Sequence, residues 1–401
     1  MIKMEVIAKT REVGAGEDTS LMDLRILGGK LAGICYMPDD YCSNAIQDVV
    51  GADKRAGSTA KSGHHSVQDH GNITVLIQGI PKMVVMILNS TQYYTTSEKS
   101  ARYTRMADIT GYEKFFYDKW AKILAEKIKE KYTKIDDVAA NKLAQENARY
   151  MTSVFTPTVM AYTTSYRQLN YLVDWCDKLV DSLDKIDGRF NKILCEHVKE
   201  LREAIMGVLG VKVLTDNKDR YFELLPMQHG IQTDAHENHF GDVYSTEYRM
   251  SLAALAQAQR HRTINYQMLF SGTDALEYGF YVPKIIRDDV ELTAEWLKDI
   301  GSMAENFPQG TLVDVIEQGM AKDFVLKCKE RLCGRAQLEI MQNTVDTLGY
   351  FEHPDKPLSR YNQHLFNNMT YDGTVPKCGF KDYKCAEPCI WGITEGLTRL
   401  I

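Results

Sequence analysis

The chain is organised around the basic stretch Gln259-Arg260-His261-Arg262-Thr263. It follows residues 251–258, a run of mostly small or apolar side chains without charge that favours a helix. Arginine side chains suit the oxygens of phosphate and carboxylate groups, so the triplet from Arg260 to Arg262 is a candidate anion-binding site. The alternative is a solvated helix end, where positive charge also complements the helix dipole.

The composition of the whole chain is that of a soluble globular protein. It has 401 residues, 44% of them hydrophobic and 25% charged, enough for one large domain or two to three smaller ones. The net charge of −6 gives no general reason to bind nucleic acid. Apolar runs such as residues 83–88 are too short to cross a membrane, and residues 1–7 lack the apolar segment of a signal peptide. Nine scattered cysteines suit a reducing, cytoplasmic setting.

A second polar cluster lies far upstream, at residues 63–70, and contains His64, His65, Ser66, Asp69 and His70. Imidazole and carboxylate groups are metal ligands, but no cysteine or further acid stands at ligand spacing. We therefore favour a hydrogen-bonded polar turn that leads into a strand at 73–77, rich in β-branched residues. The preceding Gly/Ser-rich segment, 51–63, is expected to be a mobile loop.

Three polar residues alternate after this strand: Glu98, Ser100 and Arg102. In an extended segment they would project from one side and offer an acceptor, a hydroxyl and a phosphate-binding fork. The alternative is an ordinary surface ion pair between Glu98 and Arg102 on a helix.

The rest of the chain is predicted to be mainly helical and to contain an internal repeat. Apolar residues recur at helical spacing over 112–149 and from 166 to about 208, and further helices are expected at 288–305 and 312–349. His236 and His239 echo the upstream histidine cluster, and an apolar stretch again precedes a polar one. This self-similarity predicts an internal duplication, with copies at 1–210 and 211–401.

The C-terminal tail gathers three of the cysteines, Cys378, Cys385 and Cys389. A zinc site needs four ligands, and neither a fourth ligand nor a standard ligand spacing is evident. We therefore assign no metal here, and metal binding by the tail is left open.

The order of these motifs resembles the flavin-dependent thymidylate synthase family. The hallmark Arg-His-Arg is present at 260–262, and Glu98-Lys99-Ser100-Ala101-Arg102-Tyr103 is similar to the family's Glu-x-Ser-x-Arg. Arg331 and Ala336-Gln337-Leu338-Glu339-Ile340 resemble its C-terminal helix. The resemblance implies an α+β fold, a mixed sheet with packed helices, in two tandem copies. Each copy departs from the signature, because the triplet position reads Ser90-Thr91-Gln92 in the first copy and the later motif reads 268–272 in the second.

The resemblance also implies roles for individual residues. Catalytic roles fall to His261 and Arg262, with Arg260, His261, Arg262, Ser66, Asp69 and Arg331 around FAD, and Glu98, Ser100, Arg102 and Tyr103 around the nucleotide. In such enzymes the flavin supplies the hydride chemistry and the protein supplies positioning and charge. NADPH and methylene-tetrahydrofolate would be co-substrates.

The implied reaction is transfer of a one-carbon unit to C5 of deoxyuridine monophosphate (dUMP). Family sites form between subunits, so a homodimer of this chain would form a pseudo-tetramer and unite the two surviving motif halves. Two alternatives remain: altered one-carbon chemistry on a pyrimidine nucleotide, such as hydroxymethylation, and a non-catalytic flavin- or nucleotide-binding paralogue.

Overall fold

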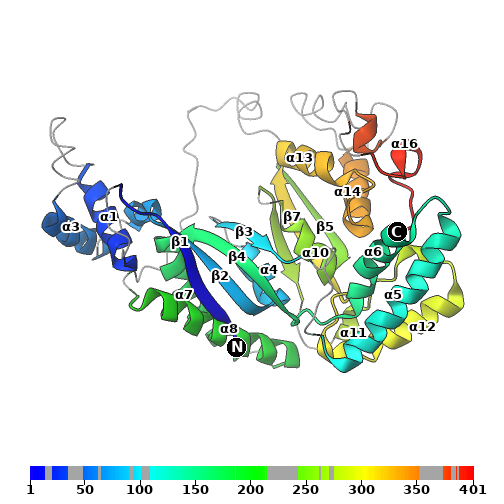
Figure 1. Cartoon of the computed structure of the whole chain (residues 1–401), viewed down its shortest axis with the longest axis horizontal. Coiled ribbons are helices and arrows are strands. Elements are labelled where there is room, and N and C mark those ends of the chain that lie inside the picture. Colours follow the sequence, from blue (N-terminus) through cyan, green and yellow to red (C-terminus); the bar gives the residue numbers. More distant parts are fainter. Residues whose placement is uncertain are drawn as a thin grey trace. The chain divides into compact units, whose positions relative to one another are not determined.

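The computed structural model describes most of the 401 residues. The described ranges are 1–13, 20–34, 48–61, 65–90, 94–100, 109–185, 187–212, 214, 243–261, 263–270, 275–351, 374–380, 385 and 388–401. The chain divides into two compact units, one of residues 1–99 and 157–223 and the other of residues 100–156 and 224–401. Each unit has its own antiparallel sheet with helices (Figure 1).

Unit 1 is built on a four-stranded antiparallel sheet. Its order is β1-β2-β4-β3, with strands Lys3–Lys9, Asn72–Pro81, Pro157–Ser165 and Tyr94–Glu98 for β1, β2, β4 and β3. The register pairs Asn72 with Ser165 and Tyr94 with Thr164. In β2 the β-branched residues Ile73, Val75 and Ile77 are buried at every second position, as expected of a strand with one face toward the core. The predicted strand is confirmed and is longer than predicted.

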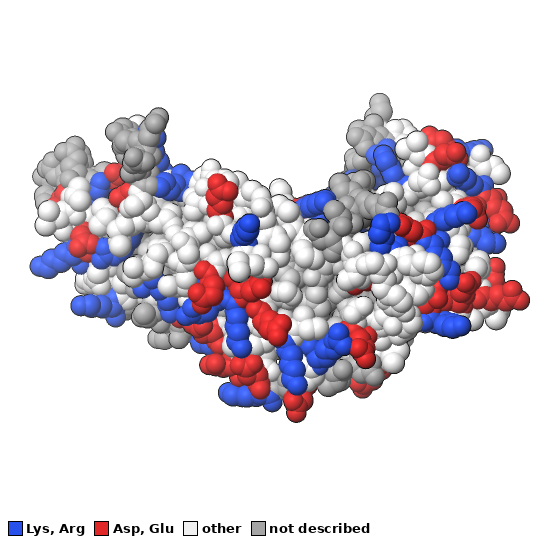
Figure 2. All heavy atoms as spheres, turned by 60° about the horizontal axis from the view of Figure 1, so that its bottom comes forward, with Lys and Arg blue, Asp and Glu red and all other residues white. Residues whose placement is uncertain are grey.

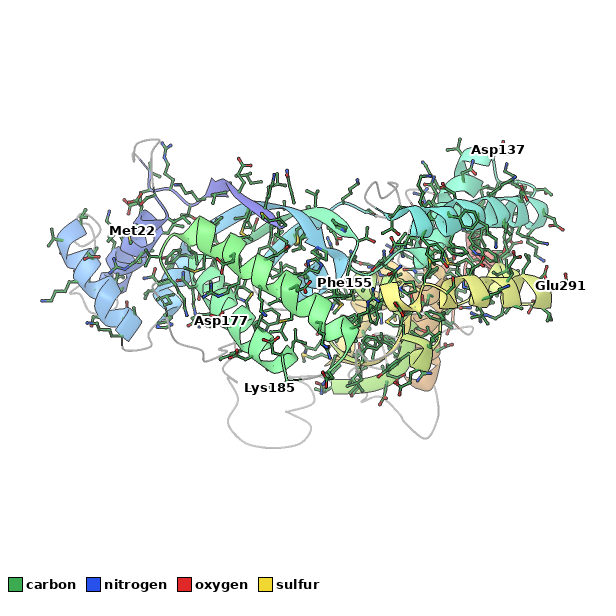
Figure 3. All side chains as sticks on the ribbon, turned by 90° about the horizontal axis from the view of Figure 1, so that it is seen from below. Met22, Asp137, Phe155, Asp177, Lys185 and Glu291 are labelled. Atoms are coloured by element: carbon green, nitrogen blue, oxygen red, sulfur yellow. The ribbon has the colours of Figure 1, made fainter. Side chains whose placement is uncertain are left out.

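Several helices accompany this sheet in unit 1. They are α1 (Leu21–Ile34), α3 (Val49–Lys61), the 3-10 helix η1 (His65–His70), α4 (Lys82–Ser90), α7 (Tyr166–Leu183) and α8 (Arg189–Leu209). The long helices α7 and α8 lie side by side across one face of the sheet, and Asp177 of α7 pairs with Arg202 of α8 (Figure 3). Ser165 ends β4 and caps α7 by accepting a hydrogen bond from the Gln168 backbone N–H.

The loop expected at 51–63 is wrong, because residues Val49–Lys61 form α3. Its small residues serve close helix packing instead of a turn. Ala52 and Ala56 are buried one turn apart, and a Cβ at Gly29 of α1 would lie 2.0 Å from the Ala52 carbonyl oxygen. Two helices that approach this closely need glycine and alanine at the contact, and the same composition resembles a loop in the sequence.

Unit 2 begins with a helical pair that the periodicity predicted correctly. Helices α5 (Gly111–Lys131) and α6 (Asp137–Ala148) occupy the region expected to be helical at 112–149. Thr110 and Glu113 form a capping box at the start of α5. The core joins α5 to α12 (Val290–Gly301) through Trp120 and Trp296, whose ring centroids lie 4.7 Å apart in an edge-on arrangement.

The sheet of unit 2 has three antiparallel strands in the order β5-β7-β6. The strands are Val243–Ser251, Leu312–Met320 and Asn265–Leu269 for β5, β7 and β6; the helices beside them are α10 (Leu252–Ala258), α11 (Ala275–Tyr278), α13 (Ala321–Arg331), α14 (Leu338–Phe351) and α16 (Gly392–Glu395). A helix over the whole of 312–349 was expected, and its first part is wrong. Val313, Val315 and Glu317 are buried alternately, the two-residue period of a strand.

The same order of elements occurs twice along the chain. The order strand, short helix, strand, helices, strand, helix, helix runs from β2 to α8 and again from β5 to α14, although α5 and α6 of the first run belong to unit 2. In each sheet the last of these strands lies between the other two. The α+β class is confirmed, but the expected mixed sheet is wrong, because every pair of strands in the two sheets is antiparallel. The tandem duplication stays a prediction. The copy boundary at 210/211 also stays a prediction, because α5 and α6 precede this boundary in sequence but belong to the second compact unit.

The surface charge and the lengths of the helices complete the description of the fold. Acidic and basic side chains are interspersed over the face shown in Figure 2, without a broad region of one sign. None of the described helices combines the length and apolarity needed to cross a membrane.

Candidate functional site

The basic triplet lies between a short helix and a strand of unit 2. Ser251 caps α10 by accepting a hydrogen bond from the Ala254 backbone N–H, and the helix ends at Ala258. The His261 N–H donates to the Ala258 carbonyl, and β6 starts four residues after His261. A solvated helix end is wrong for His261, because its exposed fraction is 6%. Arg260 is half-buried, and Arg262 lies outside the described residues.

His261 contacts Arg331, which the family resemblance placed near the same cofactor. The Arg331 Nε–H donates to His261 Nε2 over 2.6 Å, from the end of α13. Nε2 must therefore be the unprotonated nitrogen, and the ring is a neutral Nδ1–H tautomer. Burial lowers the pKa of His261 to about 3, and the positive charges of Arg331 and Lys327 add to this effect. Glu330, which is more than half exposed, lies 3.8 Å from Nδ1.

This neutral histidine gives unit 2 a stability that depends on pH. A histidine whose pKa is lowered by folding contributes stability above its unfolded pKa of 6.5, and loses it as the pH falls toward about 3. Between about pH 7.5 and about pH 5 we expect the free energy of unfolding to fall by about 2 kcal/mol for this reason. Urea unfolding of the parent and of His261→Gln at both pH values measures it. An equal dependence on pH in the two proteins would contradict the assignment.

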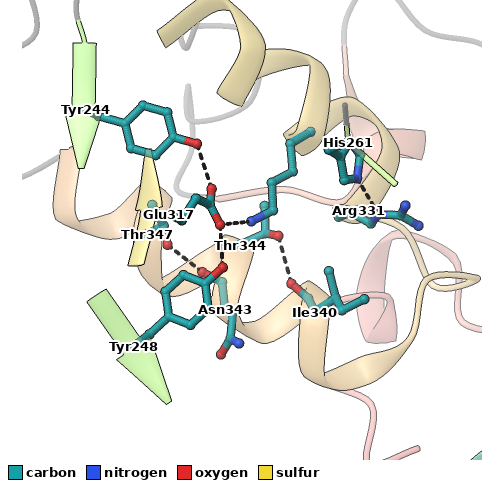
Figure 4. A network of polar contacts seen from close by, with 10 residues as sticks. Tyr244, Tyr248, His261, Glu317, Arg331, Ile340, Asn343, Thr344 and Thr347 are labelled. Atoms are coloured by element: carbon teal, nitrogen blue, oxygen red, sulfur yellow. Dashed lines mark hydrogen bonds and ion pairs between the residues drawn. The ribbon is translucent and has the colours of Figure 1, made fainter. Parts of the chain in front are cut away.

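A buried ion pair between Glu317 and Lys327 lies near His261 and Arg331 (Figure 4). Glu317 of β7 accepts hydrogen bonds from Tyr244 Oη and Lys327 Nζ, each over 2.6 Å, and from Tyr248 Oη (Figure 4). The exposed fractions of the Glu317 and Lys327 side chains are 0% and 1%. Burial, and then the Glu317 carboxylate, raises the pKa of both tyrosines, so their phenols are neutral donors.

The buried network around Glu317 was not predicted from the sequence. Tyr244 and Tyr248 stand four residues apart on β5, on the same side of the strand, and Lys327 follows on α13. The Lys327 Nζ also lies 5.8 Å from the ring centroid of Tyr266 on β6. The signal was the two-residue alternation that ends in an inward Glu317, and it was hidden because residues 312–320 were read as a helix.

The Ala336–Ile340 motif fixes the start of α10, the helix that leads into the triplet. Glu339 is buried and accepts hydrogen bonds from the Ser251 N–H and Oγ, each over 2.6 Å, and from Tyr150 Oη over 3.1 Å. Gln337 Nε2 donates to the same Tyr150 Oη over 2.7 Å. Burial raises the pKa of Glu339, an effect that these donors oppose. The polar residues of this motif thus connect α14 to the N-terminus of α10.

In unit 1, Glu98 forms an ion pair with a residue that the sequence analysis did not consider. Lys82 Nζ donates to both carboxylate oxygens of Glu98 over 2.6 Å, and the Glu98 side chain is 7% exposed. Glu98 ends the strand β3, so the extended alternative is confirmed at this position and the helical one is wrong. Ser100 follows and is half-buried, whereas Arg102 and Tyr103 lie outside the described residues.

Asp69 lies in a hydrogen-bonded turn that leads into β2, as expected. It accepts hydrogen bonds from Ser165 Oγ over 2.8 Å and from Arg167 Nη1 over 2.7 Å. His65 lies 2.6 Å from Tyr171 Oη through Nδ1 and is buried. Ser66 belongs to the same 3-10 helix, η1, and His64, His236 and His239 are outside the described residues. The turn therefore links the start of β2 to the junction of β4 and α7.

Residues 29–175 match the family model described as thymidylate synthase complementing protein. These residues include Ser66, Asp69 and the motif from Glu98 to Tyr103, and the triplet at 260–262 lies outside them. No curated protein matches the chain.

Solved structures similar to this chain include two nucleotide enzymes. A UMP/dUMP methylase PolB from Streptomyces cacaoi, bound with 5-Br dUMP, is 17% identical, with 43% of this chain and 77% of that chain covered and a TM-score of 0.30. Thymidylate Synthase X (ThyX) from Helicobacter pylori, with FAD and dUMP, is 15% identical, with 52% and 93% covered and a TM-score of 0.30. The match to the thymidylate synthase complementing protein family over residues 29–175 confirms the resemblance seen in the motif from Glu98 to Tyr103.

Proposed function

We propose that this protein is a flavin-dependent enzyme that transfers a one-carbon unit from methylene-tetrahydrofolate to C5 of dUMP, with NADPH as reductant. The observation that carries the proposal is the family match over residues 29–175, which contain the nucleotide motif. The triplet and Arg331, which lie outside the match, add the second half of the family signature.

The residues around the triplet fit an anionic cofactor such as FAD. Glu317 and Lys327 offset each other in the interior, and His261 is neutral. The arginines therefore set the sign of the local charge, which Glu330 at the surface offsets in part. Guanidinium groups suit the diphosphate of a dinucleotide. Arg260, Arg262 and Arg331 would hold these phosphates, and the bound flavin would supply the hydride chemistry.

His261 would act as a positioning group and hydrogen-bond donor. Its Nε2 is occupied by Arg331, so Nδ1–H is the group left to meet a ligand. A neutral imidazole also avoids adding charge beside the reacting ring. Arg331 thereby keeps the ring in one tautomer, as well as contributing its own positive charge. Ser66 and Asp69 would also lie near the flavin, as the family resemblance implies, with Asp69 oriented by Arg167 and Ser165.

The nucleotide would bind at the segment that follows β3. Arg102, Ser100 and Tyr103 would hold the 5′-phosphate, for which a hydroxyl and a guanidinium are suitable donors. Glu98 would order this segment through its ion pair with Lys82, since its carboxylate is already directed to that ammonium group.

Nucleotide binding tests this assignment directly. Arg102→Ala should raise the dissociation constant of dUMP about 10- to 100-fold, because a charge-assisted hydrogen bond contributes about 1.5–3 kcal/mol. Calorimetric titration of the purified variants measures the constant. Arg105→Ala is the matched control, a neighbouring arginine that is not in the motif, and should bind like the parent. An unchanged dissociation constant in Arg102→Ala would reject its role.

A further inference from the structure

Four cysteines of unit 2 lie on two segments that contact each other, the C-terminal tail and the turn between α13 and α14. Three of them, Cys378, Cys385 and Cys389, belong to the tail motif for which the sequence offered no fourth ligand. The fourth is Cys333, which lies two residues after the end of α13. All four are free thiols and half-buried.

Backbone contacts bring Cys333 and Cys378 together. The Lys377 N–H donates to the Leu332 carbonyl over 2.5 Å, and these two residues directly precede the two cysteines. The Phe380 N–H donates to the Lys377 carbonyl, which closes the 3-10 helix η5 around Cys378. The tail is thus attached to the turn at the position of both thiols.

A second contact places Cys389 against the same turn. A Cβ built at Gly334 would lie 2.9 Å from the Cys389 Sγ, so this sulfur touches the residue next to Cys333. Arg335 Nη2 also reaches the Pro388 carbonyl over 3.4 Å. The glycine is needed here, because a larger residue at 334 would displace the sulfur or the Trp391 ring, which lies 2.6 Å from the same point.

The fourth thiol, Cys385, lies in the same tail segment, seven residues after Cys378 and four before Cys389. It is half-buried, as those two cysteines are. Cysteines elsewhere in the described residues differ from this group, since Cys176, Cys195 and Cys328 are buried in helices.

Four cysteines that converge from two chain segments match the ligand set of a structural zinc site. Zinc takes four thiolates in a tetrahedron, with Zn–S distances of about 2.3 Å. Among the described residues, no group of three histidine, cysteine, aspartate or glutamate side chains is arranged to hold a metal ion. Zinc binding would therefore require the four cysteine side chains to move closer together. The cysteines lie in a turn, a 3-10 helix and irregular backbone, which can move inward more easily than helices or strands.

We propose that Cys333, Cys378, Cys385 and Cys389 bind one zinc ion through four sulfur atoms. Each thiol loses its proton on binding, so four protons are released for each ion bound. Four thiolates leave no open position for substrate, which makes the site structural. Zinc would anchor the tail to the turn after α13, two residues from Arg331, and so stiffen the segment that carries this arginine to His261.

Metal analysis of the full-length protein tests this proposal. After expression with added zinc and gel filtration under reducing conditions, elemental analysis should find one zinc ion per chain. Cys333→Ser should lose the ion. Cys195→Ser is the matched control and should retain it, since Cys195 donates to Asp184 over 3.1 Å in unit 1, a bond that serine can keep.

X-ray absorption at the zinc edge gives a second measurement on the unmodified protein, so the test does not depend on how the variants fold. It should show four sulfur neighbours at about 2.3 Å. Absence of zinc from the parent, a shell of nitrogen and oxygen, or full zinc content in Cys333→Ser would overturn the proposal. The result is independent of flavin and nucleotide binding.

Discussion

Glu317→Gln should lower the free energy of unfolding of unit 2 by about 3–5 kcal/mol, because it leaves a buried lysine without a charged partner. The Lys327 side chain is 1% exposed and its ammonium contacts Glu317 over 2.6 Å. An amide has no charge with which to stabilise that ammonium. Urea unfolding at neutral pH, followed by tryptophan fluorescence, reports mainly on this unit because three of the four tryptophans, Trp120, Trp296 and Trp391, lie in it.

The same strand offers a matched control. Asp314 of β7 pairs with Arg249 of β5, but both side chains are substantially exposed, at 32% and 53%. Asp314→Asn should therefore change the free energy of unfolding by less than about 1 kcal/mol. The double variant Glu317→Leu with Lys327→Met removes both charges and should lose less stability than Glu317→Gln. A loss below about 1 kcal/mol in Glu317→Gln would show that the buried pair is not needed.

Replacing Arg260 and Arg262 together by alanine should weaken FAD binding about 100-fold or more. Two charge-assisted hydrogen bonds to phosphate are lost, each contributing about 1.5–3 kcal/mol. Titration of FAD fluorescence with the purified protein measures the dissociation constant. Arg249→Ala removes an exposed arginine of the same unit that pairs with Asp314, and it should bind FAD like the parent. If the double variant bound FAD with the same affinity as the parent, the triplet would not be part of the flavin site.

Mixed dimers test whether the two motif halves come from different chains. The triplet variant and Arg102→Ala should each be inactive alone. If a site joins one chain's nucleotide motif to its partner's triplet, half of the mixed molecules are heterodimers with one intact site, so mixing restores about a quarter of the parent activity. No restoration after verified subunit exchange would place both motifs of a site in one chain.

Helical periodicity predicted much of the fold, and failed where the same residue types serve another purpose. The apolar spacing around Trp120 correctly predicted α5 and α6, and the β-branched run correctly predicted β2. Small residues such as Ala52 and Ala56 resembled a loop because close helix packing uses the same composition. Strand β7 resembled a helix because the acids at 314 and 317 interrupt its apolar pattern, although one of them is buried with a lysine.

Some residues of the candidate site were predicted from the sequence and others were not. The resemblance of motifs assigned both His261 and Arg331 to one cofactor, and the structure shows that they contact each other. Lys82, the partner of Glu98, could not be chosen from sequence, because any of several cations could have reached that carboxylate. The fourth thiol of the cysteine cluster was equally hidden, since Cys333 is 45 residues from Cys378 and only the fold brings them together.

Product analysis is the most direct test of flavin-dependent methyl transfer to dUMP. The purified protein is incubated with FAD, methylene-tetrahydrofolate, NADPH and dUMP, and the nucleotide is analysed by mass spectrometry. We expect a product heavier than dUMP by one added methyl group, formed only when FAD is present. A product with an added hydroxymethyl group, or no product from protein that has bound FAD and dUMP, would contradict reductive methyl transfer to dUMP.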